Sequence, residues 1–450
     1  MARVSFWRFD FQGPRSGVRM VRNSDVSFSE QKTGRRVGDD AANSAMLKRF
    51  ARFALRHVAF WLAKSRLFRA AAPWPGRIGR WLGLQPPPPR GALALTREWA
   101  AARAQDGRSY AEVGPGVTLR RPAPFCFGGD LDWRIRIQTE PCLNPPLFLA
   151  TLPHARVVGP NGTVITSDNL LLGDLSQDWF FKPEQHPLFY RFKLPPVKKL
   201  SGKIVNLARL SGWNYAHWVV ETLPRWDLLR QAGIDWREAD GFIFNGPGVG
   251  FQSESLDLLG VPTEKRIFLN SQSHIECEQL IAPSLSGISG QPTPWVVEYL
   301  RNKVAAGAKK PGSPARLYIS RSKAKFRNVV NEAEVRGVLA QHGFTAIYCE
   351  ELAFREQVSL FAGAEAVVAP HGAGLSNLVF CPRGTKVIEF FSPRYVNAYF
   401  WAVCHAGDLP YVCVLGTGPR PAVGKDPHDG ENNMQVNVTE LDRALKHFRL

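Results

Sequence analysis

The sequence lacks the features of a disulfide-stabilised or membrane-spanning protein. Its seven cysteines are odd in number and include no Cys-x-x-Cys pair, which argues against both a disulfide framework and a zinc site. No apolar run reaches the roughly 18 residues needed to cross a bilayer, and residues 1–45 contain no apolar core of a signal peptide. We therefore expect a reduced, cytoplasmic chain that could associate peripherally with the inner face of the plasma membrane.

Acidic residues are scarce at one end of the chain. The 450 residues carry 57 Lys and Arg against 39 Asp and Glu, a formal net charge of +18. Residues 1–100 hold 19 of these cations and only 6 of the acids, a net of +13, so the rest of the chain is only mildly basic. A nucleic-acid binder would need basic charge over its folded body together with a recognition motif, and neither is present. The 44% of hydrophobic residues is instead enough for a sizeable globular core.

The basic front divides into two parts. Residues 1–45 are polar and mixed in charge, which predicts disorder, and Met46 could be the true start of translation. Residues 46–90 contain a predicted amphipathic helix with a cationic side, a shorter basic piece at 77–84, and four consecutive prolines that form a stiff linker. Such a helix could bind an anionic membrane surface, or it could pack on the body with its cations in solvent. Both readings stay open.

The body has the pattern of an α/β protein. Residues 91–200 have the pattern of short strands and turns, and beyond residue 200 short apolar runs alternate with helical stretches, as in parallel sheets covered by helices. A Pro-rich break then predicts a β-rich domain at 91–292 and a second domain at 293–450, facing each other across a cleft suited to two substrates. Strands are expected at 203–208, 241–245, 265–269, 278–282, 315–320, 345–349, 364–369, 385–391 and 410–415, and helices at 214–231, 251–259, 293–307, 331–342, 354–363, 375–381 and 438–448.

The first group of candidate site residues is Asn214, His217 and Glu221. On a helix, His217 and Glu221 are four residues apart and share a face, with Asn214 one turn earlier. A carboxylate beside an imidazole can orient it or raise its pKa, which gives a base able to deprotonate a hydroxyl. The alternative is an ordinary core helix, with Asn214 as its N-cap and His217 as a satisfied polar residue.

The second group follows a predicted buried strand, where residues 366–377 run through a small-residue loop into a helix. This geometry directs backbone N–H groups at an anion such as a diphosphate, and Gly372 and Gly374 permit close approach. His371 could donate to a phosphate oxygen. The alternative is a tight strand-to-helix turn, in which Asn377 is a cap, and a Gly-x-Gly alone is a weak signal.

Two further motifs lie at the ends of predicted strands. Arg321 and Arg327 belong to a basic loop at 318–328 and could clamp phosphates, although many such loops are merely solvated. Glu389 lies in the apolar run 386–391, where an isolated carboxylate is costly. It could accept the hydroxyls of a ribose, or it could form a salt bridge with Arg321 or Arg327.

Taken together and in this order, these motifs resemble glycosyltransferase family 61. The resemblance rests on Asn-Tyr-Ala-His-Trp at 214–218 with Glu221, on the basic loop, and on His-Gly-Ala-Gly-Leu-Ser-Asn at 371–377 followed by Val-Ile-Glu. The resemblance covers roughly residues 150–415. The basic loop matches only in part, because many bacterial members have a further Arg where this chain has Asn328. The family includes plant xylan-decorating, animal O-linked N-acetylglucosamine and bacterial polysaccharide enzymes. We expect a bacterial capsule or exopolysaccharide type.

The resemblance implies a GT-B architecture of two facing Rossmann-like domains, with residues 91–292 on the acceptor side and 293–450 on the donor side. It also implies inverting chemistry and no required metal or other cofactor. None of the four motifs contains Asp-x-Asp, which agrees with the absence of a metal. A hydroxyl of a polysaccharide, glycolipid or other glycan would be deprotonated by His217 or Glu221 and attack a nucleotide sugar, expected to be UDP-linked. The alternative is a non-catalytic scaffold at a membrane surface that retains a transferase fold. The expected donor-side residues are Arg321, Arg327, His371, Gly372, Ala373, Gly374, Asn377 and Glu389.

Overall fold

The computed structural model describes residues 74–101, 109–179, 181–427, 430 and 432–450. All of them belong to one compact unit, residues 70–450. The predicted disordered start at 1–45 and the predicted helix from Met46 to 72 lie outside the described residues. In the described part of the chain, no helix is both long and apolar enough to cross a membrane.

The first of two large sheets is mixed rather than parallel throughout. Its central strands β10, β11, β12 and β13 run parallel to one another, as the alternating pattern predicts. Strands β6 and β7 pair antiparallel with β13, because the short strands before residue 200 are joined by tight turns instead of crossover helices. The bounds are β1 Gly91–Leu93, β2 Ser109–Gly114, β6 Leu147–Pro153, β7 Arg156–Val158, β8 Thr163–Ile165, β9 Leu170–Leu172, β10 Lys198–Asn206, β11 Gly241–Asn245, β12 Arg266–Leu269 and β13 His274–Pro283.

The second sheet is parallel throughout, with the order β15-β14-β16-β17-β18-β4. Its last strand comes from the early part of the chain, since β4 pairs with β18 at one edge. A strand from the expected first domain, 91–292, therefore belongs to the sheet of the expected second domain, 293–450. The division into an acceptor-side and a donor-side domain stays a prediction. The bounds are β4 Phe125–Phe127, β14 Arg316–Ile319, β15 Thr345–Ile347, β16 Ala366–Pro370, β17 Lys386–Phe391 and β18 Tyr411–Leu415; a separate pair is formed by β3 Val117–Leu119 and β5 Cys142–Asn144.

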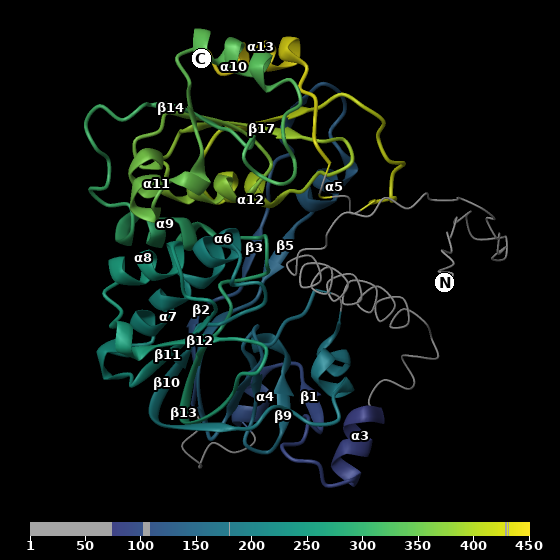
Figure 1. The fold of residues 1–450 in the computed structure, drawn as a ribbon, viewed down its shortest axis with the longest axis vertical. Helices are drawn as coiled ribbons and strands as arrows, with labels where there is room; N and C mark the ends of the chain where they lie inside the picture. Colours follow the sequence, from purple (N-terminus) through teal and green to yellow (C-terminus); the bar gives the residue numbers. More distant parts are fainter. Residues whose placement is uncertain (1–73, 102–108, 180, 428–429, 431) are drawn as a thin grey trace, which may run out of the picture. The chain divides into compact units, whose positions relative to one another are not determined.

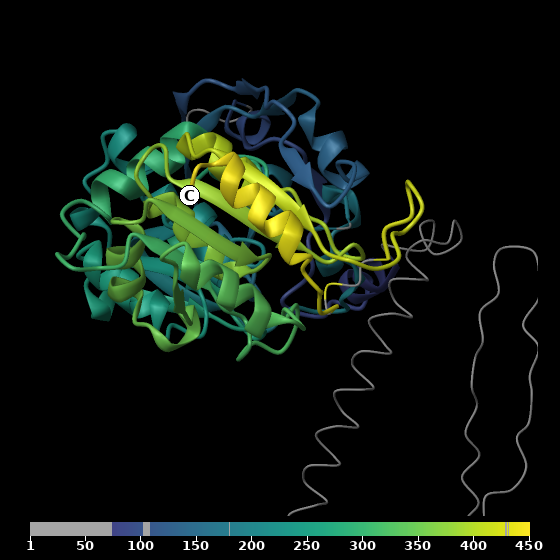
Figure 2. The same cartoon turned by 90° about the horizontal axis from the view of Figure 1, so that it is seen from above.

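Helices cover both faces of the second sheet. Alternate residues of its strands point to opposite faces, so Val367 joins the largest core cluster together with α9, α11 and α12, whereas Val368 joins the cluster beneath α10 and α13. Figure 1 shows these two layers on either side of β14 and β17, and Figure 2 shows α13, in yellow, lying over the strands. The bounds are α3 Trp74–Trp81, α4 Thr96–Ala101, α5 Trp133–Arg136, α6 Tyr215–His217, α7 Arg225–Gln231, α8 Phe251–Leu258, α9 Pro294–Lys303, α10 Glu332–Gln341, α11 Phe354–Phe361, α12 Tyr399–Gly407 and α13 Val438–His447.

A buried arginine fixes the carboxyl ends of the first sheet's central strands. The guanidinium of Arg225, at the start of α7, is fully buried and donates to the carbonyl oxygens of Asn206 at the end of β10 and Pro283 at the end of β13. It also donates to three carbonyls just beyond these strands, at residues 207, 208 and 284. Burial lowers the pKa of Arg225 to about 9, and the five acceptors offset the cost of burying its charge.

Two predicted helices differ from the observed backbone. The expected continuous helix 214–231 is broken into α6, a π-helical turn at Trp218–Thr222 and α7, because Pro224 cannot donate a helical hydrogen bond. The expected helix 375–381 is a 3₁₀ helix at Ala373–Phe380. Helix α12 was not predicted. The other short 3₁₀ helices are Ile137–Thr139, Gly173–Leu175, Pro183–Gln185, Pro187–Tyr190, Trp236–Glu238, Thr263–Lys265 and Cys349–Glu351.

Candidate active site

A cavity of about 700 Å³ brings together the two groups of motif residues from the two sheets. Asn214 and His217 line it from the loop and helix that follow β10, and Ser289 and Gly290 lie beside them. The opposite wall comes from the carboxyl ends of the second sheet's strands, which is where parallel α/β sheets bind ligands. The lining residues of that wall include Arg327, His371, Gly372, Ala373, Tyr395, Tyr399 and Phe400.

His217 and Glu221 meet as their spacing predicts. Nδ1 of His217 lies 3.2 Å from Oε2 of Glu221. The same Nδ1 lies 3.4 Å from Nη1 of Arg209, whereas Nε2 has no hydrogen-bond partner among the described residues. In the tautomer that carries its proton on Nδ1, toward the Glu221 carboxylate, the lone pair of the neutral ring lies on Nε2. About a fifth of the His217 side chain is exposed, whereas Glu221 is buried. His217 is thus the member of the pair that a ligand in the cavity can reach.

Glu221 is occupied by other donors. Arg209 forms a buried ion pair with it, Ser289 Oγ donates to both of its oxygens at 3.1 Å, and Gly290 N donates at 3.0 Å. The hydroxyl of Tyr399 in α12 donates to Oε1 at 2.9 Å. A carboxylate held by this many donors is an orienting group and a counter-charge rather than a free base. The arrangement favours His217 as the proton acceptor of the pair.

The electrostatics of His217 follow from its surroundings. Burial, with the charge of Arg209 as a second cause, lowers the pKa of His217 from 6.5 to about 4. The ring is therefore neutral at physiological pH, as a base must be before it accepts a proton. The backbone of Arg209 is fixed by Asn245 at the end of β11. The Asn245 side chain accepts from the N–H of Arg209 and donates to its C=O.

Asn214 is placed as a helix cap. Its side-chain oxygen accepts from the N–H of Ala216 at 2.9 Å, which is the N-cap geometry of α6, and the residue also lines the cavity. Tyr215, the next residue, reaches in the other direction, and its hydroxyl donates to Asn377 at 2.7 Å. The base-bearing segment and the glycine loop are thus joined by one direct hydrogen bond.

The second wall is built around His371. Its Nδ1 lies 2.6 Å from Oε1 of Glu389, and the hydroxyl of Tyr411 donates to the other oxygen of Glu389 at 2.7 Å. Glu389 has no exposed surface and does not line the cavity. The structure therefore places Glu389 behind His371, where it cannot reach a ribose, and its ion-pair partner is His371 instead of Arg321 or Arg327. Its position leaves Nε2 of His371 for the cavity.

The two arginines occupy different positions. Arg327 lines the cavity: its Nε donates to the carbonyl oxygen of His371 at 3.0 Å, and its guanidinium carbon lies 5.1 Å from the centre of the Tyr395 ring. Its φ of +60° is rare for a residue with a side chain and is typical of backbone held for a local purpose. Arg321 lies beneath Gly372 and donates to the carbonyl oxygen of Phe326, so it supports the loop and does not line the cavity.

Gly372 is required by the close approach of Arg321. A Cβ on Gly372 would lie 2.1 Å from Nη1 of Arg321. Gly372→Ala should therefore displace the guanidinium from its hydrogen bonds to Phe326 and lower the free energy of unfolding by about 1–3 kcal/mol. Denaturant unfolding measures this. Gly337→Ala is the matched control, since a Cβ on Gly337 in α10 meets nothing within 4 Å and alanine does not destabilise a helix. A Gly372→Ala variant as stable as Gly337→Ala would contradict this role of Gly372.

Asn377 and Gly374 are structural. Asn377 is fully buried, and its amide donates to Gln357 at 2.8 Å and to the carbonyl oxygen of Gly374 at 3.0 Å. It neither caps a helix nor contacts the cavity, in contrast to both expected roles. A Cβ on Gly374 would lie 3.2 Å from Sγ of Cys349, so that glycine serves packing under the loop. Of the loop residues, His371, Gly372 and Ala373 line the cavity.

Arg209 and Tyr399 are the main site residues that the sequence did not reveal. A buried carboxylate such as Glu221 needs a cation, and Arg209 follows the predicted strand 203–208, so that rule could have identified it. No comparable signal exists for Tyr399, because α12 is almost entirely apolar and looks like core. Trp179 is a third site residue that the sequence did not reveal. Its ring centre lies 5.4 Å from that of His217, and its indole N–H donates to Ser211 Oγ.

The carboxylates of the described residues do not form a metal-binding group. No cluster of three or more His, Cys, Asp or Glu side chains with suitable placement occurs in the described part of the chain. One Asp-x-Asp triplet exists outside the four motifs, at Asp130 and Asp132. Asp132 caps α5 and forms a two-bond ion pair with Arg134, so its oxygens are already used by the protein.

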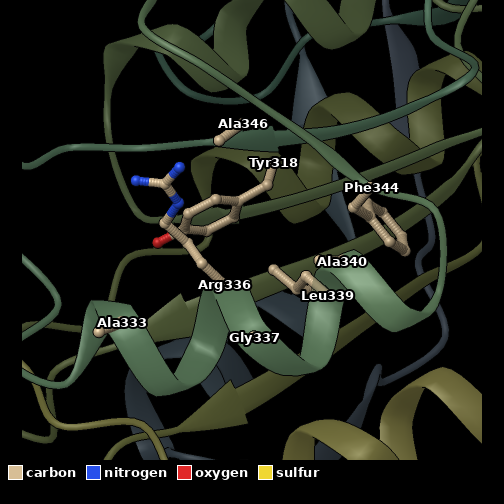
Figure 3. A pocket seen from close by; sticks show the side chains of 8 residues that line it. All are labelled: Tyr318, Ala333, Arg336, Gly337, Leu339, Ala340, Phe344 and Ala346. Carbon is tan, nitrogen blue, oxygen red and sulfur yellow. The ribbon is translucent and has the colours of Figure 1, made fainter.

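A smaller hollow of about 400 Å³ lies beside α10, away from these residues. Figure 3 shows the ring of Tyr318 and the side chain of Arg336 above the small residues of the helix. The Tyr318 hydroxyl donates to Glu332, and Arg336 alone supplies a charged group. The hollow contains none of the candidate catalytic residues, so the larger cavity is the candidate site.

The fold is α/β, and its larger cavity has His217 on one wall and residues 371–373 on the other. Comparison with known proteins indicates the class. Residues 215–388 match the family model Glycosyltransferase 61. The human protein O-linked-mannose β-1,4-N-acetylglucosaminyltransferase 2 is 32% identical over 131 residues, which are 27% of this chain and 22% of that protein. The chimpanzee form is 33% identical over the same shares. The Drosophila EGF domain-specific O-linked N-acetylglucosamine transferase is 27% identical over 106 residues, 23% of this chain and 20% of that protein.

Residues 215–388 are therefore similar to glycosyltransferase family 61, and the likeness to glycosyltransferases lies in this part of the chain. The matched segment contributes His217 to one wall of the cavity and Arg327 and His371 to the other. Asn214, Tyr395, Tyr399 and Phe400 line the cavity from outside this segment. The alignments span only about a fifth of the length of the curated relatives. The expected bacterial capsule or exopolysaccharide type stays a prediction.

Proposed function

We propose that the chain is an inverting, metal-independent glycosyltransferase of GT-B type that moves a sugar from a UDP-linked donor to a hydroxyl of a glycan acceptor. The observation that carries the proposal is the single cavity with the neutral His217 on one wall and the positive Arg327 beside His371 on the other. Single displacement with inversion needs one base on the acceptor side and charge neutralisation on the leaving-group side, and the two walls offer these separately.

On the donor side, the diphosphate lies against His371, Gly372 and Ala373 at the end of β16. Arg327 supplies fixed positive charge, and its Nη2 has no hydrogen-bond partner among the described residues. Glu389 balances the charge that His371 carries when both of its ring nitrogens donate. These groups would stabilise the negative charge on the departing diphosphate without a divalent cation.

On the acceptor side, Nε2 of His217 takes the proton of the attacking hydroxyl. The new bond forms between the acceptor oxygen and C1 of the sugar as the bond from C1 to the diphosphate oxygen breaks. The charge that develops on the His217 ring is compensated by Glu221, which Arg209 and Tyr399 hold in place. Trp179, about half exposed next to His217, offers an aromatic face for an acceptor sugar.

A screen of nucleotide sugars tests the proposal. The protein is incubated in EDTA with each donor, and release of the nucleoside diphosphate is followed, with N-acetylglucosamine first because the named relatives transfer it. We expect slow donor hydrolysis with one UDP-sugar, unchanged by the chelator, and release of the opposite anomer as seen by NMR. Activity that needs an added divalent metal, or a product with retained configuration, would contradict the proposed chemistry. Failure to bind any nucleotide would favour the non-catalytic scaffold.

The pH profile provides a separate prediction. Because burial and Arg209 lower the pKa of His217 to about 4, the base is fully deprotonated through the physiological range. We expect kcat/KM to stay flat on its acid side and to fall only as the pH drops toward about 4, since protonation of His217 removes the base. Circular dichroism at each pH controls for unfolding. An acid limb near the ordinary histidine value of 6.5 would contradict the environment assigned to His217.

A further inference from the structure

Helix α3 packs through its glycines and turns its bulky side chains outward. A Cβ on Gly79 would lie 1.8 Å from the carbonyl oxygen of Phe192, and one on Gly76 would lie 2.7 Å from that of Phe189. Both glycines are buried against this backbone. The helix is therefore seated on the segment 189–192 by its smallest residues, and its opposite face is left for solvent or a partner (Figure 1).

That outward face is strongly apolar. Trp81 is 82% exposed and Leu82 is 55% exposed, and Phe192 from the adjoining segment is 53% exposed. Ile78, one turn before Trp81 and Leu82, is exposed as well. We call these four residues the α3 surface. Large aliphatic and aromatic side chains gathered at one place on a protein surface mark an interaction site.

Positive charge surrounds the α3 surface. Arg77, Arg191 and Lys193 are all exposed next to its apolar residues. No Asp or Glu occurs anywhere in residues 41–97, which carry 11 Lys and Arg, and none occurs between Glu184 and Glu221. An acidic protein partner or an anionic lipid surface would complement this charge, but only a lipid surface also takes up a tryptophan and aliphatic side chains without a shaped pocket.

We propose that the α3 surface docks the enzyme on an anionic membrane, with Trp81, Leu82 and Phe192 entering the interface and Arg77, Arg191 and Lys193 contacting lipid phosphates. Amphipathic tryptophan prefers the level of the lipid headgroups, and nearby cations add attraction to anionic lipids. This site is distinct from the catalytic cavity and does not depend on the proposed chemistry. It would bring a glycosyltransferase to lipid-linked or membrane-bound acceptors.

Vesicle flotation with the full chain tests the proposal. The protein is mixed with vesicles of phosphatidylcholine alone or with about one third phosphatidylglycerol, and the floating fraction is measured in a density gradient. We expect wild-type protein to bind the anionic vesicles about tenfold better than the neutral ones, and less well in high salt. The variant Trp81→Ser/Leu82→Ser should bind the anionic vesicles about tenfold more weakly than wild type.

Val423→Ser is the matched control, since Val423 is an equally exposed apolar residue outside the α3 surface, at 81% exposure. It should float like wild type. Thermal unfolding checks that each variant is folded, and UDP affinity should be the same in all three proteins. Wild-type protein that fails to float with anionic vesicles, or a double variant that floats as well as wild type, would overturn the proposal.

Discussion

Replacing His217 with alanine should lower kcat by about 10³-fold while leaving the affinity for the donor nucleotide nearly unchanged. On the proposed acceptor-side wall, the imidazole is the group that is neutral, reachable from the cavity and backed by a carboxylate. Its loss removes the proton acceptor without altering the wall that holds Arg327 and His371. Steady-state kinetics together with UDP titration separate the two effects.

Two variants sharpen this prediction. His217→Gln keeps a polar side chain of similar size and should be as inactive as the alanine variant, because the amide cannot accept the proton. Glu221→Gln should lower kcat less than loss of His217, since Glu221 positions the ring and compensates its charge. If His217→Ala retained activity within a few-fold of wild type, the base would have to be another group and the assignment would be wrong.

Breaking the buried pair of Arg209 and Glu221 should have the largest effect on stability. Both side chains are almost fully buried, and Arg209 has no other carboxylate beside it in the described part of the chain. Arg209→Met or Glu221→Leu leaves one charge buried without its counter-ion, which costs about 3–5 kcal/mol. Denaturant unfolding of each single variant should show that loss.

The double variant distinguishes a charge effect from a packing effect. When both charges are replaced together, no unpaired charge remains, so Arg209→Met/Glu221→Leu should be more stable than the sum of the two single losses predicts. Kinetics should show that the double variant is nonetheless poorly active, because Glu221 no longer orients His217. Strictly additive losses of stability would show that the two side chains do not interact as the structure has them.

The sequence predicted some of the residues that line the two walls of the candidate cavity, because their signals are local. A four-residue spacing brings His217 beside Glu221 even though the backbone there is a π-helical turn, and strand β11 lies at the predicted residues 241–245. The strands of the second sheet other than β4 were also predicted to within one or two residues, since each is a short buried apolar run between turns.

The partners of these residues could not be predicted because they come from distant parts of the chain. Tyr399 is 178 residues from Glu221, and Tyr411 reaches Glu389 from the neighbouring strand β18. Glu389 was expected to bind a ribose, but it is buried behind His371. The sequence could not predict this, because alternation along a strand does not say which face meets the ligand. The joining of β4 to the second sheet is another long-range pairing without a local signal.

Calorimetric titration of UDP in the presence of EDTA tests the central claim most directly, with wild-type protein, Arg327→Ala and His217→Ala measured side by side. The proposal predicts that wild type and His217→Ala bind UDP with similar affinity and without added metal. Arg327→Ala should bind about tenfold or more weakly, because it loses a charged contact to the diphosphate. Absence of UDP binding by the wild type, or equal affinity in all three proteins, would contradict a donor site at this cavity.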